Sequence, residues 1–412
     1  MMKKFFVLLV VVLSAAVFAL PGDLVLESGP YKVLFAKKHF YASSQYFYDG
    51  VEIGNRNGFY GTIFASSLNK FVGSGHSEGG AEKIVSLKLL CDGKPCEVEP
   101  KEFKGKKLEF TKVSLLNNLQ VTAKITVTPD DIVIDKSFEA VAPQQYYSMY
   151  VFQFCWSTVL DKWMINRPNG TFADGTFKSN GGWFLRGRES EIRYWALYNS
   201  QARKGIIGFF SKYFPQQGSY MLWDQKTYHK FYFSAKNPKQ LAKGYKSPAY
   251  QLVLKGFSAD KENWMSAVKA QGEVFEKKYP MPLPPAKIEL FKEPLKLAGN
   301  GKFLCRKELI PLVAGKKYAV TLEIRKSGKI SPRVWQNNVL VGQHDLKRKF
   351  SIIASLAQRV KADDKWHREK VVFTAPAKIY ESAILFYNSD SNGTVEVKNV
   401  LIERLDDKTG EK

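Results

Sequence analysis

The chain has few of the residues that build metal and redox sites. Its 412 residues include only four cysteines and five histidines, and they do not supply the two closely spaced pairs of a structural zinc site. The sequence predicts neither a phosphate-binding loop nor a nucleophile elbow. The sequence therefore predicts no bound metal and no cofactor.

Long apolar runs are also missing, except at the N-terminus. Lys3 and Lys4 precede the unbroken apolar run Phe5–Leu13, and residues 17–19 (Val-Phe-Ala) have small side chains at the first and last positions of a cleavage site. We expect residues 1–19 to be a signal peptide and the protein to be secreted or periplasmic. The run is short for a membrane span and no later segment is apolar enough, so we expect no membrane association after cleavage.

Acidic residues are too few to balance the basic ones. Lys and Arg number 62 against 39 Asp and Glu, a net charge of +23, and removal of Lys3 and Lys4 leaves +21. The excess is spread over both halves, and no basic-aromatic motif accompanies it, so nucleic acid is not an expected partner. An anionic polysaccharide or cell surface fits this charge better.

The cysteines support one disulfide at most. Cys91 and Cys96 bracket the turn sequence Asp-Gly-Lys-Pro, and a bridge across such a hairpin is plausible in an oxidising compartment. Cys155 lies inside an aromatic segment and Cys305 is far away in the sequence, so we expect both to be buried thiols.

Aromatic residues are abundant, at 14%, and they recur in short extended runs separated by glycine and asparagine turns. This pattern predicts an all-β protein: a large antiparallel β-supersandwich over residues 20–280, then a smaller β jelly roll over 287–406. Residues 281–286 begin Met-Pro-Leu-Pro-Pro and are typical of a stiff linker. One helix is expected, Ala259–Lys278, capped by Asp260.

The C-terminal part resembles secreted carbohydrate-binding modules of the jelly-roll type. The residues that carry the resemblance are 312–322 (a glycine turn, a Tyr and a strand), Asp364-Lys-Trp366 before the strand Glu369–Phe373, and the last two strands, 383–388 and 395–400. Such modules bind sugars through exposed aromatic side chains. The resemblance implies a sugar site here, for which Trp335 is the candidate; the alternative is that Trp335 belongs to the core.

The N-terminal part is similar to the galactose-mutarotase-like supersandwich. The similar segments are residues 46–50 (Tyr-Phe-Tyr-Asp-Gly), the turn at 57–58 (Asn-Gly), the glycine-rich 75–83, and the long strand 146–156. Family members that act as epimerases use two histidines and a glutamate base, a set that this chain does not match in full. The resemblance implies the fold and a saccharide groove, and leaves mutarotase activity in doubt.

Proton-transfer groups gather in the glycine-rich segment Gly73–Lys83. A histidine beside carboxylates supplies a group that titrates near neutrality, which makes His76 and Glu78 candidate catalytic residues and Glu82 a candidate ligand-binding residue. Arg56 and Tyr60, in the preceding glycine-rich loop, are further candidates, with Arg56 pairing to a uronate carboxylate. The alternative is a polar loop in which Glu82 and Lys83 simply open a strand.

A second cluster contains Trp183, Arg186 and Arg188. Alternation places the two arginines on one face of an extended segment, where they would neutralise an acidic sugar, and Tyr194 or His76 could then act as the base of a β-elimination. The alternative is a strand edge kept soluble by charge.

Three readings follow from these patterns. The first is a secreted carbohydrate-binding protein that recognises a polysaccharide, possibly acidic, through the supersandwich groove and the appended module. The second is an enzyme on that groove, with a polysaccharide lyase favoured over a mutarotase. The third is a structural cell-surface protein that needs neither site.

Overall fold

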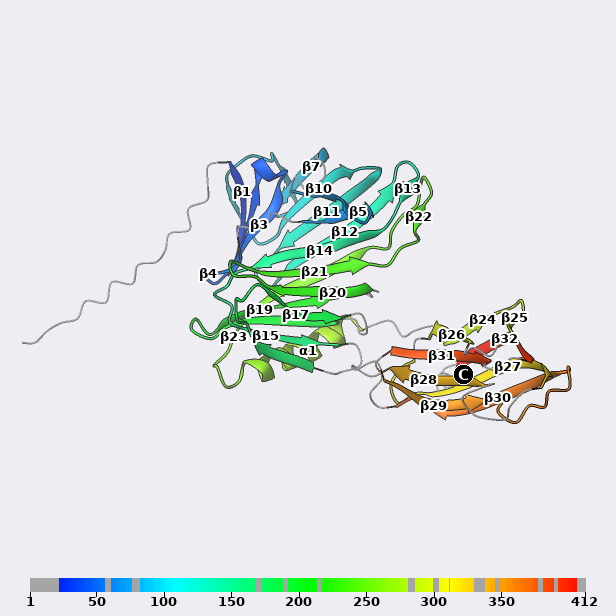
Figure 1. Ribbon diagram of the computed structural model, residues 1–412. Helices are drawn as coiled ribbons and strands as arrows, with labels where there is room; N and C mark the ends of the chain where they lie inside the picture. Colours follow the sequence, from blue (N-terminus) through cyan, green and yellow to red (C-terminus); the bar gives the residue numbers. More distant parts are fainter. Residues whose placement is uncertain are drawn as a thin grey trace, which may run out of the picture.

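The computed structural model describes residues 22–55, 61–75, 82–167, 172–187, 192–212, 216–280, 286–298, 304–310, 312–329, 338–344, 349–376, 381–388 and 392–405. Side chains are described for all of these except 183–187, 216–221, 304–309, 344 and 381. Apart from helix α1 and a short 3-10 turn, the regular structure in these ranges is β-strand, so the predicted all-β class is confirmed (Figure 1).

The first sheet of the N-terminal part contains eleven described strands. Its order is β17-β20-β21-β14-β4-β3-β2-β1-β9, with β5 also paired to β14 and β6 to β5. All neighbours are antiparallel except β1 and β9. The strands are β1 (Asp23–Ser28), β2 (Tyr31–Ala36), β3 (Ala42–Tyr48), β4 (Val51–Gly54), β5 (Ile63–Ser67), β6 (Lys70–Gly73), β9 (Glu102–Lys104), β14 (Ser148–Trp156), β17 (Gly182–Gly187), β20 (Gln216–Asp224) and β21 (His229–Ala235).

The second sheet contains ten strands in the order β16-β15-β18-β19-β23-β12-β11-β10-β7-β8. They are β7 (Lys83–Cys91), β8 (Lys94–Cys96), β10 (Leu108–Leu116), β11 (Leu119–Val127), β12 (Ile132–Ala140), β15 (Lys162–Asn166), β16 (Phe172–Thr176), β18 (Tyr194–Asn199), β19 (Lys204–Phe210) and β23 (Tyr250–Ser258). The 3-10 turn η1 (Lys37–His39) follows β2, and a small two-stranded sheet joins β13 (Gln144–Gln145) to β22 (Gln240–Leu241).

The two sheets enclose one aromatic core. Successive side chains of a strand point to opposite faces, so Phe154 and Trp156 of β14 point inward and meet Trp195 of β18 at ring distances of 6.4 and 5.0 Å. All three are buried, and Trp156 and Trp195 are fully so. The odd-even pattern therefore leaves the opposite side chains of β14, such as Gln153, for the outer face of the first sheet.

Helix α1 (Trp264–Lys278) covers the outer face of the second sheet. Trp264 stacks on Tyr198 at 5.2 Å, and Phe275 stacks on Phe209 at 4.7 Å. The helix begins five residues later than we expected. Asp260 does not cap it, because its carbonyl accepts the N–H of Asn263 in a preceding turn and its carboxylate pairs with Arg203. No helix in the described ranges is long and apolar enough to cross a membrane.

Residues 286–405 form a second, smaller sandwich (Figure 1, yellow to red). Side chains of both its sheets, among them Leu322 and Ile402 from one and Val341 and Phe386 from the other, share one core. Its jelly-roll connectivity and the linker at 281–286 stay predictions. One sheet contains β24 (Lys287–Leu290), β25 (Leu295–Ala298), β27 (Lys317–Gly328), β30 (Trp366–Thr374) and β32 (Gly393–Arg404), and the other β26 (Leu304–Leu309), β28 (Val339–His344), β29 (Phe350–Leu356) and β31 (Glu381–Asn388).

Candidate functional site

Polar and aromatic residues meet on the outer face of the first sheet. Gln153 of β14 pairs with Tyr232 of β21, and in the next row Cys155 pairs with Lys230. The Lys230 Nζ lies 5.0 Å from the centre of the Tyr232 ring, and the Tyr150 ring lies 4.9 Å from the same ring. We call these five residues the Gln153 face.

Four residues of the Gln153 face are buried although they lie outside the core, and Tyr150 is half-buried. The exposed fractions are 2% for Gln153, 5% for Cys155, 7% for Lys230 and 8% for Tyr232. Neither amide atom of Gln153 has a hydrogen-bond partner among the described residues. A buried amide left unpaired costs about 1 to 3 kcal/mol, so Gln153 calls for a hydrogen-bond partner, such as a water or a ligand, that the described residues do not supply.

A β-bulge puts Tyr150 and Gln153 on the same face. Tyr150 pairs with Ser234 and Phe152 with Phe233, so that Val151 is an extra residue in β14. Val151 and Phe152 both pack into the core. The bulge shifts the alternation by one residue, and two residues three positions apart therefore face outward together.

The predicted Glu82 belongs to a buried ionic cluster beneath this face. Its Oε1 lies 2.8 Å from Lys112 Nζ, its Oε2 accepts the N–H of Gly75 at 2.8 Å, and Ser74 Oγ donates to Oε1 at 3.0 Å. The Glu82 side chain is fully buried. We correct the prediction that Glu82 contacts a ligand: both its oxygens are bonded within the fold, while Lys83 opens β7 as the alternative reading expected.

Four other predicted residues lie outside the described residues. They are Arg56 and Tyr60, between Asn55 and Gly61, and His76 and Glu78, between Gly75 and Glu82. The ends of the two segments are close together, since Gly61 N donates to Ser74 O at 3.1 Å. The first segment also begins beside the Gln153 face, since Asn55 N donates to Cys155 O at 2.7 Å. The roles predicted for the four stay predictions.

The predicted arginine cluster belongs to the same sheet. Arg186 pairs with Met221, which pairs with Tyr232, so Arg186 lies in the row that ends at Gln153. In the next row Trp183 pairs with Trp223, which pairs with Lys230. The side chains of Trp183 and Arg186 are outside the described part of the chain, as is all of Arg188.

Tyr194 was predicted as a base in that groove, and the structure places it elsewhere. It lies in β18 of the second sheet, under α1, where a Cβ added to Gly272 would come within 2.5 Å of its hydroxyl oxygen. Its exposed fraction is 4%. Burial raises the pKa of Tyr194 well above its usual value, so it is not a base for a ligand on the first sheet. Tyr194 is only eight residues from Arg186 in the sequence, but the chain passes from the first sheet to the second between them.

The predicted hairpin is present: Cys91 lies at its closed end, Cys96 ends β8 opposite Leu89, and both are free thiols in this structure. Burial and the neighbouring Cys96 thiol raise the pKa of Cys91 to about 12. The disulfide stays a prediction. Cys155 is a buried free thiol, which confirms that expectation.

A histidine that the patterns did not single out is fully buried at one end of the first sandwich. His229 Nδ1 lies 3.0 Å from Asp224 Oδ1, its Nε2 lies 3.1 Å from Leu160 O, and its ring stacks on Phe177 at 3.5 Å. Burial lowers the pKa of His229 despite the carboxylate. Nε2 is hydrogen-bonded to a backbone carbonyl, whereas Nδ1 and Asp224 Oδ1 lie close together without hydrogen-bond geometry. The full burial of the ring indicates a structural role.

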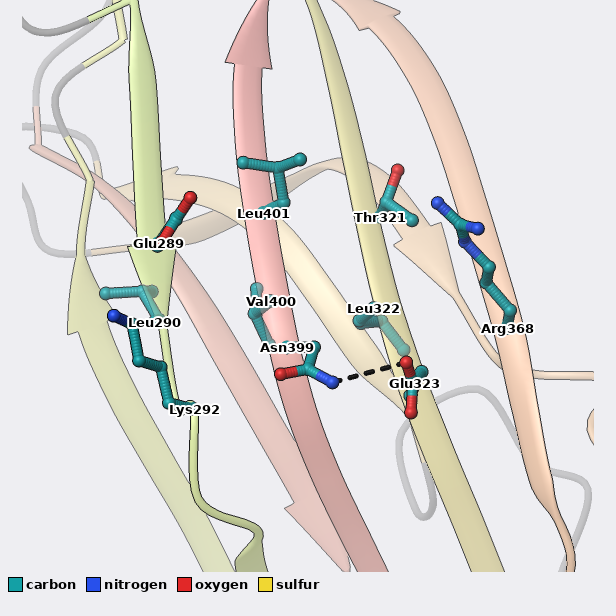
Figure 2. Close-up of a pocket in the computed structure, with 10 residues that line it drawn as sticks. All are labelled: Glu289, Leu290, Lys292, Thr321, Leu322, Glu323, Arg368, Asn399, Val400 and Leu401. Carbon is teal, nitrogen blue, oxygen red and sulfur yellow. Dashed lines mark hydrogen bonds between the residues drawn. The ribbon is translucent and has the colours of Figure 1, made fainter.

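The C-terminal sandwich carries a groove on the outer face of its larger sheet (Figure 2). Its volume is about 520 Å³, within the usual range of small-molecule sites. One of its two carboxylates already has partners, since Glu323 accepts the Asn399 amide at 3.2 Å (Figure 2) and lies 3.3 Å from Lys398 Nζ. Trp335 is outside the described residues. The groove is lined by Glu289, Leu290, Lys292, Thr321, Leu322, Glu323, Arg368, Asn399, Val400 and Leu401.

No group of three or more His, Cys, Asp and Glu side chains within the described ranges could hold a metal ion. The expected absence of a metal stays a prediction for the whole chain.

Comparison with known proteins finds similar shapes at low sequence identity. A galactose mutarotase-like protein from Lactobacillus casei has a TM-score of 0.33 at 10% identity, covering 57% of this chain and 100% of that one. A galactose mutarotase related enzyme from Lactobacillus acidophilus has 0.34 at 8%, covering 58% and 98%.

A longer protein is also similar in shape. An α-galactosidase from Lactobacillus brevis has a TM-score of 0.39 at 12% identity, covering 62% of this chain and 42% of that one, so the match spans less than half of the galactosidase. No protein-family model matches the sequence, and no curated protein matches it either.

Proposed function

We propose that the protein binds a saccharide on the Gln153 face, and that it does so outside the cytoplasm after its signal peptide is removed. The observation that supports this most is the buried, unpaired amide of Gln153 beside Tyr232 and Lys230. A primary amide offers donors and an acceptor together, which suits adjacent sugar hydroxyls that each do both.

The surroundings of the amide favour the same class of ligand. Tyr150 and Tyr232 place aromatic rings beside the amide, and aromatic rings are groups on which the C–H groups of a pyranose pack. The net charge of +23 favours a sugar that carries a carboxylate or sulfate. We therefore propose an acidic polysaccharide as the preferred ligand.

Replacement of Gln153 by leucine tests this site. The variant keeps the side-chain volume and removes the hydrogen bonds to sugar, so we expect affinity for the best glycan of an acidic and neutral panel to fall about tenfold or more. Isothermal calorimetry or affinity electrophoresis measures this. Gln120→Leu, on β11 of the other sheet, is the matched control and should bind as the parent does.

Two results would contradict the proposal: no glycan of the panel binds the parent, or Gln153→Leu binds as tightly as the parent. The same incubations, followed by ultraviolet absorbance for an unsaturated product, address the lyase reading, which still depends on His76 and Glu78.

A further inference from the structure

Two lysines lie where the strand pattern requires apolar side chains. Lys112 of β10 and Lys136 of β12 both pair with Ala123 of β11, so the three residues form one row on the inner face of the second sheet. The exposed fractions are 5% for Lys112 and 8% for Lys136. Burying an ammonium group is costly unless it is fully hydrogen-bonded. The hydrogen-bond acceptors of each lysine therefore indicate its role.

Lys112 completes the Glu82 cluster, whereas Lys136 reaches across the core to the first sheet. Its Nζ donates to Val151 O at 2.7 Å, to Thr62 Oγ1 at 2.9 Å, and to Gly61 O. Thr62 Oγ1 also donates to Val151 O at 3.2 Å. All the acceptors are neutral oxygens, and Val151 is the bulged residue of β14.

The Val151 bulge is the feature that brings Tyr150 and Gln153 onto one face. A bulged residue is left out of the regular ladder, and the carbonyl of Val151 takes its hydrogen bonds from Lys136 and Thr62 instead. The same ammonium also donates to the carbonyl of Gly61. The N–H of Gly61 in turn donates to Ser74 O, so Lys136 holds this segment as well as the bulge.

We propose that Lys136 is a positioning residue for the saccharide site: it acts from the opposite sheet, through the Val151 bulge, to hold Tyr150 and Gln153 in the geometry that binds sugar. This inference rests on the proposed function for its ligand and on the bulge geometry for its mechanism. The charged groups that face Lys136 are Lys112 of β10 and Glu82 at the start of β7, while β14 presents the Phe152 ring at 5.4 Å.

Hydrogen exchange tests the mechanism without a ligand. In Lys136→Met we expect the amides of Gly61 and Ser74 to exchange about tenfold faster than in the parent, because the carbonyl of Gly61 and the hydroxyl of Thr62 have lost their donor. Amides of the β11–β12 pairing, such as that of Ala123, should keep their rates. Unchanged rates at Gly61 and Ser74, or an equal rise throughout, would overturn the inference.

The pH dependence of sugar affinity distinguishes a positioning lysine from a merely structural one, because only a positioning lysine changes the affinity when it loses its proton. Burial and the charge on Lys112 lower the pKa of Lys136 from 10.5 to about 7. The folded chain therefore loses this proton at a pH where the unfolded chain keeps it, so rising pH between about 7 and 10.5 stabilises the fold. If Lys136 positions the site, sugar affinity should fall several-fold over the lower part of that interval while thermal stability rises.

The variants separate the two proposals. Lys136→Met should bind about tenfold more weakly at pH 6 and lose this pH dependence, whereas Lys124→Met, a half-exposed lysine of β11, should match the parent. If Lys136→Met does not fold, Thr62→Val removes one partner and should weaken binding about threefold. If these variants bind as the parent does while Gln153→Leu binds weakly, the role of Lys136 is overturned and the saccharide site stands. Parent-like binding by Gln153→Leu would overturn the site itself.

Discussion

At the scale of single residues, several polar side chains stand where the pattern asks for apolar ones. Lys136 occupies an inner position of β12 between Ile134 and Phe138, and Gln153 interrupts the aromatic run between Phe152 and Phe154. A polar residue at such a position is the signal by which the sequence could have indicated the site. The titratable residues that we singled out, in contrast, either lie outside the described residues or, like Glu82, are bonded within the fold.

Gly272 shows how closely Tyr194 is packed under α1. An exposed glycine inside a helix is normally improved by alanine by about 1 kcal/mol, but a Cβ here would lie 2.5 Å from the Tyr194 hydroxyl oxygen. We expect Gly272→Ala to lower the free energy of unfolding by about 1 to 3 kcal/mol. Denaturant titration measures it, with Ser266→Ala on the exposed side of α1 as a control that should not destabilise. A stabilised Gly272→Ala would mean that Tyr194 is not fixed there.

At the scale of elements, α1 is held by one buried arginine as well as by its apolar face. Arg193 Nε lies 2.8 Å from Glu276 Oε1, and its guanidinium also donates to Phe210 O and Tyr279 O. Its side chain is 2% exposed, whereas that of Glu276 is 41% exposed. The arginine therefore joins β19, the helix and the residue after the helix.

Loss of this arginine should loosen the helix. Arg193→Met leaves two carbonyls without this donor, and we expect the free energy of unfolding to fall by about 2 to 3 kcal/mol. Chemical denaturation followed by tryptophan fluorescence measures it, because Trp264 lies in the helix. Arg203→Met removes an ion pair of two exposed side chains and should change nothing measurable. Equal effects of the two substitutions would contradict the role of Arg193.

At the scale of the whole molecule, we expect the net charge of +23 to raise the affinity for an acidic polysaccharide without determining where the polysaccharide binds. Exposed charges are screened by salt, while the amide contacts on the Gln153 face are not. We expect affinity for an acidic polysaccharide to fall about tenfold between about 0.05 and 0.5 M salt, and affinity for a neutral one to change less than about twofold. Calorimetry at both ionic strengths checks this, and identical salt dependence for the two ligands would remove the charge from the account.

The sequence by itself determined the all-β class, most strands and the helix, because alternation, aromatic content and turn residues act over a few neighbouring positions. Apolar and polar residues alternate over Leu119–Val127 and indicate β11 directly, while β23, in the middle of the second sheet, follows Pro248 and contains Gly256, which obscure its pattern. The tertiary structure decided which rows meet. Gln153 meets Tyr232 through strand pairing across almost eighty residues, and a single extra residue in β14 sets its face; such long-range register depends on the packing of both sheets, which no local pattern encodes.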